Sequence, residues 1–117
     1  MPSATHKARL AALSDAMKRE GADVLLVIGN NWHADYLRYA TDFGIQEGQG
    51  IALVRLDGAT TLLLDDPAEC ERARTEASHC DVRYAPQLVK EARAQITRAG
   101  NRHIAASPMH LLPYGLV

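Results

Sequence analysis

The chain has 117 residues, the length of a single domain with one hydrophobic core. Its net charge of −1, from 13 basic and 14 acidic side chains, gives no general attraction for nucleic acid or an anionic membrane. No apolar run approaches the roughly 20 residues that a transmembrane helix needs. Cys70 and Cys80 form neither a disulfide framework nor a metal-binding knuckle. We therefore expect a cytoplasmic protein with reduced thiols and no nucleic-acid or membrane partner.

The first predicted elements are a helix that ends at Glu20 and a strand over residues 23–29. Gly21 suits the left-handed position that terminates a helix. The buried stripe of the helix is formed by Leu10, Leu13 and Met17. Residues 23–29 read Asp-Val-Leu-Leu-Val-Ile-Gly, an apolar run typical of a strand that is covered on both faces.

An aromatic segment follows the strand directly. Asn30 or Asn31 is a suitable N-cap, because a short amide side chain accepts hydrogen bonds from the free N–H groups of a helix start. The following helix would gather one stripe at i, i+4, i+7, i+8 and i+11, formed by Trp32, Tyr36, Tyr39, Ala40 and Phe43. Base rates favour burial of this stripe in the core. The alternative is that Trp32, His33 and Tyr36 lie at the carboxyl end of a strand, where open α/β sheets bind ligands or partners.

A glycine-rich loop and a β-hairpin are predicted next. Residues 44–50 contain three glycines, which permit positive φ angles, so this segment is expected to be mobile or sharply turned. Residues 51–56 and 59–64 predict two antiparallel strands joined by the turn Asp57-Gly58.

Four shorter elements complete the pattern. Asp, Pro and Glu at positions 66, 67 and 69 predict a capped helix to about Ala77, which is weakly apolar and expected on the surface. Residues 80–84 alternate in polarity and predict a strand. Residues 86–99 predict a helix that ends at Gly100, and residues 102–106 a final strand. The inward residues of the last helix are Leu88, Ala92, Ile96 and Ala99.

This order of elements predicts an α/β fold. A hairpin followed by βαβ units gives a mixed sheet of about five strands, an antiparallel hairpin plus parallel strands, with helices on both faces. We expect residues 1–107 to form this domain. Residues 108–117 are apolar and lack a helix stop signal, so we expect them to begin the connection to a further domain.

Motifs for autonomous chemistry are missing from the sequence. The five histidines form no metal-binding pair, and no nucleophile elbow, P-loop or dinucleotide fingerprint occurs. Asp65 and Asp66 are paired carboxylates, but helix capping by Asp66 explains them more simply than a metal does. Lys90 and Arg93 are interpreted as a solvated helix face. We therefore expect no catalytic residue and no metal ligand in this chain.

The motif over residues 38–43, Arg-Tyr-Ala-Thr-Asp-Phe, carries a family resemblance together with the first helix and strand. In order and spacing these segments resemble the N-terminal domain of the creatinase/prolidase family, which includes Xaa-Pro dipeptidases, aminopeptidase P and creatinase. The family motif is Arg-Tyr-Leu-Thr-Gly-Phe, so Ala40 and Asp42 depart from it. No residue matches the loop arginine that creatinase uses on its substrate, which argues against creatinase activity itself.

The resemblance implies a ribonuclease-H-like three-layer fold and a parent protein that is a metal-dependent Xaa-Pro peptidase or related C–N hydrolase. The chemistry, with a divalent Mn, Zn or Co ion and a peptide or small C–N substrate, would belong to a C-terminal catalytic domain. The domain seen here would help to form a homodimer and cap the active site of the partner subunit. By position, the capping and dimerisation candidates are Trp32, His33, Tyr36, Gln46, Glu47 and Gln49.

Two other functions remain open. A free-standing α/β regulatory or small-ligand-binding module would use a cleft between the turn of residues 29–33 and the glycine loop. A nuclease would need the carboxylates of Asp23, Asp42, Asp65 and Asp66. We do not favour the nuclease, because caps and strand ends explain these carboxylates and no basic surface accompanies them.

Overall fold

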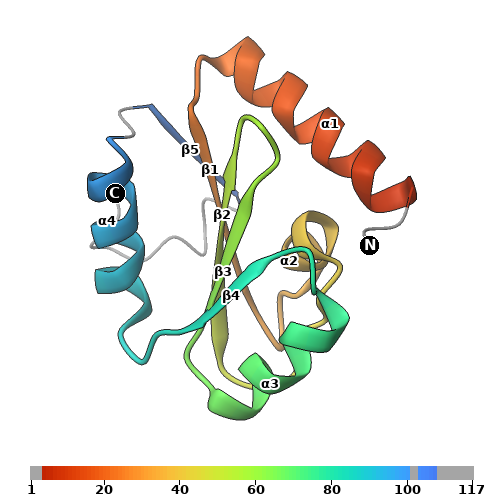
Figure 1. Cartoon of the computed structure of the whole chain (residues 1–117), viewed down its shortest axis with the longest axis vertical. Helices are drawn as coiled ribbons and strands as arrows, with labels where there is room; N and C mark the ends of the chain where they lie inside the picture. Colours follow the sequence, from red (N-terminus) through yellow and green to blue (C-terminus); the bar gives the residue numbers. More distant parts are fainter. Residues whose placement is uncertain (1–3, 101–102, 108–117) are drawn as a thin grey trace.

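A computed structural model, which describes residues 4–100 and 103–107, shows a central five-stranded sheet with helices on both faces (Figure 1). The strand order is β4-β3-β2-β1-β5. β2 runs antiparallel to β1 and β3, whereas the pairs β1–β5 and β3–β4 are parallel. The predicted α/β class and mixed sheet are confirmed. The elements in chain order are α1 (Ala4–Glu20), β1 (Val24–Asn30), α2 (Asp35–Thr41), β2 (Gln49–Arg55), β3 (Thr60–Leu64), α3 (Pro67–Glu76), β4 (Asp81–Tyr84), α4 (Leu88–Ala99) and β5 (Ile104–Ser107).

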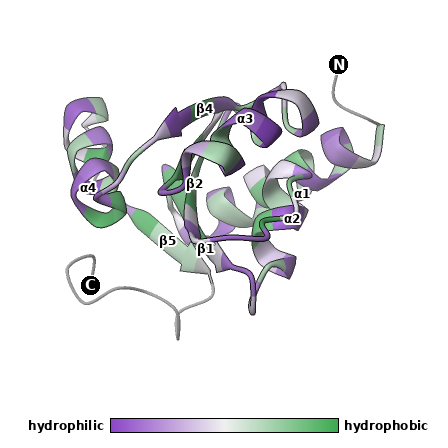
Figure 2. Cartoon of the chain, turned by 90° about the horizontal axis from the view of Figure 1, so that it is seen from below, coloured by the Kyte–Doolittle hydropathy of each residue, from purple (hydrophilic) through white to green (hydrophobic). Residues whose placement is uncertain are grey.

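Two apolar layers lie on opposite faces of the sheet. α1, α2 and α3 cover one face, whereas α4 covers the other (Figure 2). Successive residues of β1 point into different layers, as the two-residue repeat of a strand requires: Val24 packs toward α4 and Leu25 toward the other three helices. This arrangement explains why β1 is a continuous apolar run.

The strand directions place several connections at one edge of the sheet, which we call the carboxyl edge. β1, β3, β4 and β5 run in one direction, so their carboxyl ends lie beside the start of the antiparallel β2. Asn30, the last residue of β1, is paired with Gln49, the first residue of β2. The turn after β1 and the loop before β2 therefore begin and end at neighbouring positions.

Local stop and start signals act as predicted at two helix ends. α1 ends at Gly21, which has a φ of 70°, and the amide of Ala22 donates to the carbonyl oxygen of Met17 at 2.8 Å. α3 begins after Asp66, whose carboxylate accepts hydrogen bonds from two backbone amides of the first helical turn. The hairpin turn is also present, with Gly58 at a φ of 90°.

The predicted start of the aromatic helix is wrong. α2 begins at Asp35, and its N-cap residue makes no side-chain hydrogen bond. The side-chain oxygen of Asn30 instead accepts from the amides of Trp32 and His33, each at 2.9 Å. Asn30 therefore closes a tight turn, and Trp32 precedes the helix rather than forming part of it.

The predicted burial of the aromatic stripe is also wrong for three of its members. Trp32 is 84% exposed, Tyr36 54% and Tyr39 42%, whereas Ala40 and Phe43 are buried. The buried face of α2 is formed by Leu37, Ala40 and Thr41. These three residues are spaced i, i+3 and i+4 and therefore share one face of the helix. Tyr36 and Tyr39 lie outside this face and are exposed.

Smaller differences concern the ends of elements. β2 begins at Gln49, so the last two residues of the predicted loop belong to a strand. α4 begins at Leu88 rather than Pro86; Ala99 is exposed, and Gln95 is buried instead. α3 was expected on the surface, yet three of its residues, Glu69, Cys70 and Ala73, are buried. The expectation for residues 108–117 lies outside the described residues.

Candidate functional site

The six predicted site residues occupy two segments that meet at the carboxyl edge. Trp32 and His33 lie in the turn after β1, and Tyr36 lies in the first turn of α2. Gln46 and Glu47 lie in the loop before β2, and Gln49 begins that strand. All six residues are exposed. The register of β1 on β2 brings the two segments together, although they are more than ten positions apart in the sequence.

The turn after β1 is closed by hydrogen bonds on both sides. The amide of Asn30 donates to the carbonyl oxygen of His33 at 3.2 Å, and the reverse bond has the same length. The Asn30 side chain adds the two bonds described above. The turn thus holds the backbone of Trp32 in one conformation while its indole ring stays in contact with water.

Trp32, Tyr36 and Tyr39 form an exposed aromatic surface at the start of the chain's second helix. Six large hydrophobic side chains of the described residues are exposed, and three of them belong to this surface. The guanidinium of Arg9 lies over the ring of Tyr39, 5.3 Å from its centroid. Large aromatic side chains gathered at one place and left in water are typical of interaction surfaces.

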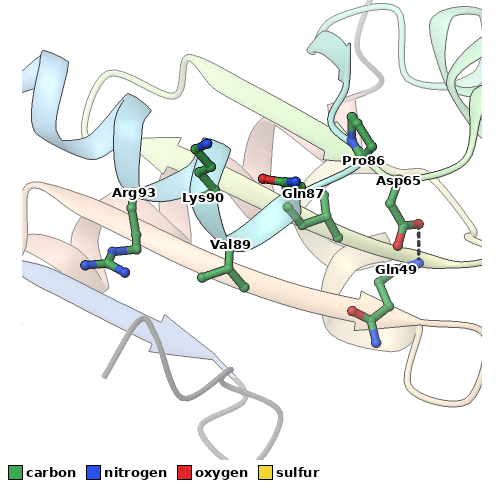
Figure 3. A pocket seen from close by; sticks show the side chains of 8 residues that line it. Gln49, Asp65, Pro86, Gln87, Val89, Lys90 and Arg93 are labelled. Carbon is green, nitrogen blue, oxygen red and sulfur yellow. Dashed lines mark hydrogen bonds between the residues drawn. The ribbon is translucent and has the colours of Figure 1, made fainter.

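A pocket of about 500 Å³ opens beside Gln49, between the start of β2, the end of β3 and the first turns of α4 (Figure 3). Asp65 accepts a hydrogen bond from the amide of Gln49 at 2.8 Å. In Figure 3 these two residues lie at one end of the pocket and Arg93 lies at the other. The lining residues are Gln49, Asp65, Pro86, Gln87, Leu88, Val89, Lys90 and Arg93.

Of the predicted site residues, only Gln49 lines this pocket. Lys90 and Arg93 are exposed, as their interpretation as a solvated helix face predicted, but their place beside a pocket was not predicted, and Gln87 was not singled out. The signal was the position of Pro86 and Gln87 after β4, because the carboxyl ends of the parallel strands β3 and β4 meet at one edge. Two cations, two side-chain amides and one carboxylate suit the binding of a polar ligand with negative charge better than they suit nucleophilic chemistry.

The carboxylates that a nuclease would need have structural partners instead. Asp42 pairs with Arg9 at 3.0 Å, and Asp23 accepts from the amide of His103 at 2.9 Å. Asp65 accepts a hydrogen bond from the amide of Gln49, and Asp66 caps α3. Within residues 4–100 and 103–107, no three His, Cys, Asp or Glu side chains converge in a way that could hold a metal ion. The described helices include none that is both long and apolar enough to cross a membrane.

A buried polar cluster lies between α1, the end of α2 and the segment before β4. His6 is fully buried, and its ring centroid lies 3.9 Å from that of His79. The Nδ1 atom of His6 is 3.9 Å from the carboxylate of Asp42. Burial lowers the pKa of both histidines, and it raises the pKa of Cys80 to about 12. The sequence prediction missed this cluster, because its members come from three separate segments.

One family model matches most of the chain. The family described as Creatinase/Prolidase N-terminal domain matches residues 9–115. No curated protein matches the chain. Among solved structures, the N-terminal domain of cytoplasmic peptidase PepQ from Mycobacterium tuberculosis H37Rv is 20% identical, with a TM-score of 0.77 over 93% of this chain and 79% of that one.

Two further solved structures differ in how much of them the chain spans. An XXA-pro aminopeptidase from Streptococcus pyogenes is 16% identical, with a TM-score of 0.78 over 98% of this chain and 81% of that one. An Xaa-Pro dipeptidase from Bacillus anthracis is 20% identical, with a TM-score of 0.71 over 93% of this chain. The chain spans only 28% of the length of that dipeptidase. At these identities the likeness concerns the fold.

Proposed function

Because the chain belongs to the Creatinase/Prolidase N-terminal domain family, we propose that it is the non-catalytic N-terminal domain of a metal-dependent Xaa-Pro dipeptidase or aminopeptidase P-like hydrolase. Its likeness in fold to the N-terminal domain of a peptidase supports this role. So does the 28% of the Bacillus anthracis dipeptidase that it spans, which leaves room for a larger catalytic domain. The divalent metal would be held by that domain, in a cytoplasmic enzyme.

The proposal extends to dimerisation and to capping of the active site in the partner subunit. The observation that carries it is the 84% exposure of Trp32 on a closed turn at the carboxyl edge. An indole ring held in this way can cover an apolar substrate group and exclude water from it. The exposed amide and carboxylate groups of Gln46, Gln49 and Glu47 can accept or donate hydrogen bonds to a peptide backbone at the same edge.

The test compares two exposed aromatic side chains in the full-length enzyme. Trp32→Ala is expected to lower kcat/KM for an Xaa-Pro dipeptide by roughly tenfold or more, because truncated aromatic contacts at an interface centre cost about 2 kcal/mol. Tyr84→Ala is the matched control, since Tyr84 is 49% exposed at the same edge but ends β4, which β2 and β3 separate from β1. Equal activity of the two variants would contradict the capping role of Trp32.

The assignment of the chemistry to another domain has its own test. The isolated chain is expected not to bind Mn²⁺ stoichiometrically and not to hydrolyse Xaa-Pro dipeptides. Stoichiometric metal binding together with hydrolysis would place the active site in this chain and overturn the proposal.

A second candidate function is supported by the pocket beside Gln49. Its volume of about 500 Å³ lies within the range of small-molecule sites, and Lys90 and Arg93 give it positive charge. A regulatory module would bind a small anionic ligand there. Saturable binding of such a ligand by the isolated chain, abolished by Arg93→Ala, would favour this function over the first.

A further inference from the structure

The loop before β2 is attached to α3 by an ion pair between the buried Glu69 carboxylate and the partly exposed Arg72 guanidinium. The Oε2 atom of Glu69 accepts from the amide of Gln46 at 3.0 Å and from the Nη2 atom of Arg72 at 2.7 Å. The same Nη2 atom donates to the carbonyl oxygen of Gly44 at 2.9 Å. Glu69 is only 5% exposed. One carboxylate and one guanidinium thus hold a donor and an acceptor of the loop backbone.

The guanidinium of Arg72 is itself fixed from other directions. Its Nη1 atom donates to Glu76 at 2.7 Å, and the group lies over the ring of Phe43, 4.6 Å from the ring centroid. Burial acts to lower the pKa of Arg72, but the hydrogen bond and charge of Glu69, with those of Glu76, raise it above its usual value. Arg72 therefore stays charged, and its planar fork is oriented by three acceptors and one aromatic face.

The other end of the loop is held by Asp65. Its carboxylate accepts from the amide of Gln49 at 2.8 Å, next to Gly48, which has a φ of 69°. A Cβ atom at Gly48 would collide with this carboxylate, and the left-handed backbone would strain any other side chain. The loop is thus sharply turned, as the glycines predicted, and it is anchored at both ends.

The chemistry of the ion pair is unusual for a purely structural contact. A buried carboxylate that loses its partners is costly, whereas apolar residues of similar size stabilise a core equally well. The sequence assigned Glu69 to a capping box, yet Asp66 caps α3 by itself and the Glu69 side chain is directed to the loop. A buried polar contact with loop backbone fixes one conformation, which is what a presenting loop requires.

We propose that Glu69 and Arg72 form a positioning clamp that fixes residues 44–48, so that Gln46 and Glu47 are presented at the carboxyl edge. Both are positioning residues, because they act through the loop backbone. The role of this loop in substrate capping rests on the proposed function, whereas the clamp itself can be tested in this chain alone.

Hydrogen exchange of backbone amides in the isolated chain tests the clamp directly. Arg72→Ala and Glu69→Gln are expected to speed exchange of the Gln46 amide by roughly tenfold or more, since hydrogen bonds to charged groups are the stronger ones. Exchange in β1 should stay slow, which separates release of the loop from global unfolding. Arg72→Lys should restore part of the protection, because an ammonium group replaces the charge but not the three-way fork.

Arg74→Ala is the matched control, because Arg74 is an exposed cation on the same helix. Glu69→Gln removes the charge of the acceptor but keeps the volume of the side chain, so it serves where Arg72→Ala fails to fold. Unchanged exchange of the Gln46 amide in both clamp variants overturns the clamp, whatever their activity.

Kinetics of the full-length enzyme then test the positioning role. Arg72→Ala is expected to raise KM for an Xaa-Pro dipeptide several-fold with little change in kcat, and Arg72→Lys should recover part of this loss. Faster exchange with an unchanged KM would overturn the positioning role. The proposed function would still be judged separately, by the Trp32→Ala variant.

Discussion

At the carboxyl edge of the sheet a tryptophan is 84% exposed, whereas between α1 and the segment before β4 a histidine is fully buried. The two regions thus reverse the usual preference of apolar side chains for the core and polar ones for water. The buried cluster joins α1 to the segments around Asp42 and His79, so its contacts are internal. In the exposed aromatic surface, Tyr39 contacts Arg9 of α1, whereas the indole ring of Trp32 stays in water. The proposed capping role of the carboxyl edge rests on this difference.

The largest expected effect separates two aromatic residues of one segment. Phe43→Ala should lower the free energy of unfolding by about 3–5 kcal/mol, because the ring is fully buried. Trp32→Ala should change it by no more than about 0.5 kcal/mol, as expected for an exposed side chain. Urea unfolding of the isolated chain measures both. If Trp32→Ala lowered the free energy of unfolding nearly as much as Phe43→Ala, Trp32 would belong to the core and not to the exposed aromatic surface.

A smaller effect is expected at Asp42, which adopts a φ of 63° where the family motif has glycine. A non-glycine residue in this region costs about 1 kcal/mol, and the ion pair with Arg9 is a partial compensation. Asp42→Gly should therefore be more stable than Asp42→Ala by about 1 kcal/mol, since both lose the ion pair but only glycine relieves the backbone. Equal unfolding midpoints for the two variants would show that the backbone strain is absent.

The smallest effect is a dependence of stability on pH. Burial lowers the pKa of His6 and His79 below 6.5, so the unfolded chain takes up protons more readily than the folded one. The contribution to stability is complete above pH 6.5 and is lost as the pH falls below that value. His6→Phe should flatten this dependence between pH 7.5 and pH 5.5, roughly the range in which an ordinary histidine titrates.

The control for the pH prediction is His33→Phe, which removes an exposed histidine at the carboxyl edge. Unfolding midpoints measured across the same pH range should keep the slope of the original chain in this variant. An unaltered slope in His6→Phe as well would remove the buried pair as the cause.

The fold could be predicted because its signals are local. Gly21, Asp66 and the Asp57-Gly58 turn each act within a few residues, and the apolar run of β1 requires cover on both faces. The start of α2 could not, because Asn30 can cap a helix or close a turn with the same side-chain oxygen. The tyrosines predicted for the core lie on the surface because α2 buries the face of Leu37, Ala40 and Thr41 instead.

The candidate site was predicted only in part, for a different reason. Strand register and the β4–α4 connection place Gln49, Asp65 and Arg93 around one pocket, and no local pattern in the sequence predicts that arrangement. Glu69 carries a capping signal, but its partner is a loop more than twenty positions away. Chemistry that depends on tertiary contacts between distant segments leaves little trace in spacing alone.

Acrylamide quenching of Trp32 fluorescence directly measures whether the indole ring is exposed at the carboxyl edge. Trp32 is the single tryptophan of the sequence, so its emission can be read in the isolated chain without a label. In dilute solution we expect Trp32 to emit at the wavelength of an indole in water and to be fully quenched by acrylamide. Protection from quenching should appear only as the chain concentration rises and copies associate. Blue-shifted emission that is protected at every concentration would contradict this expectation, because the indole would then belong to the core.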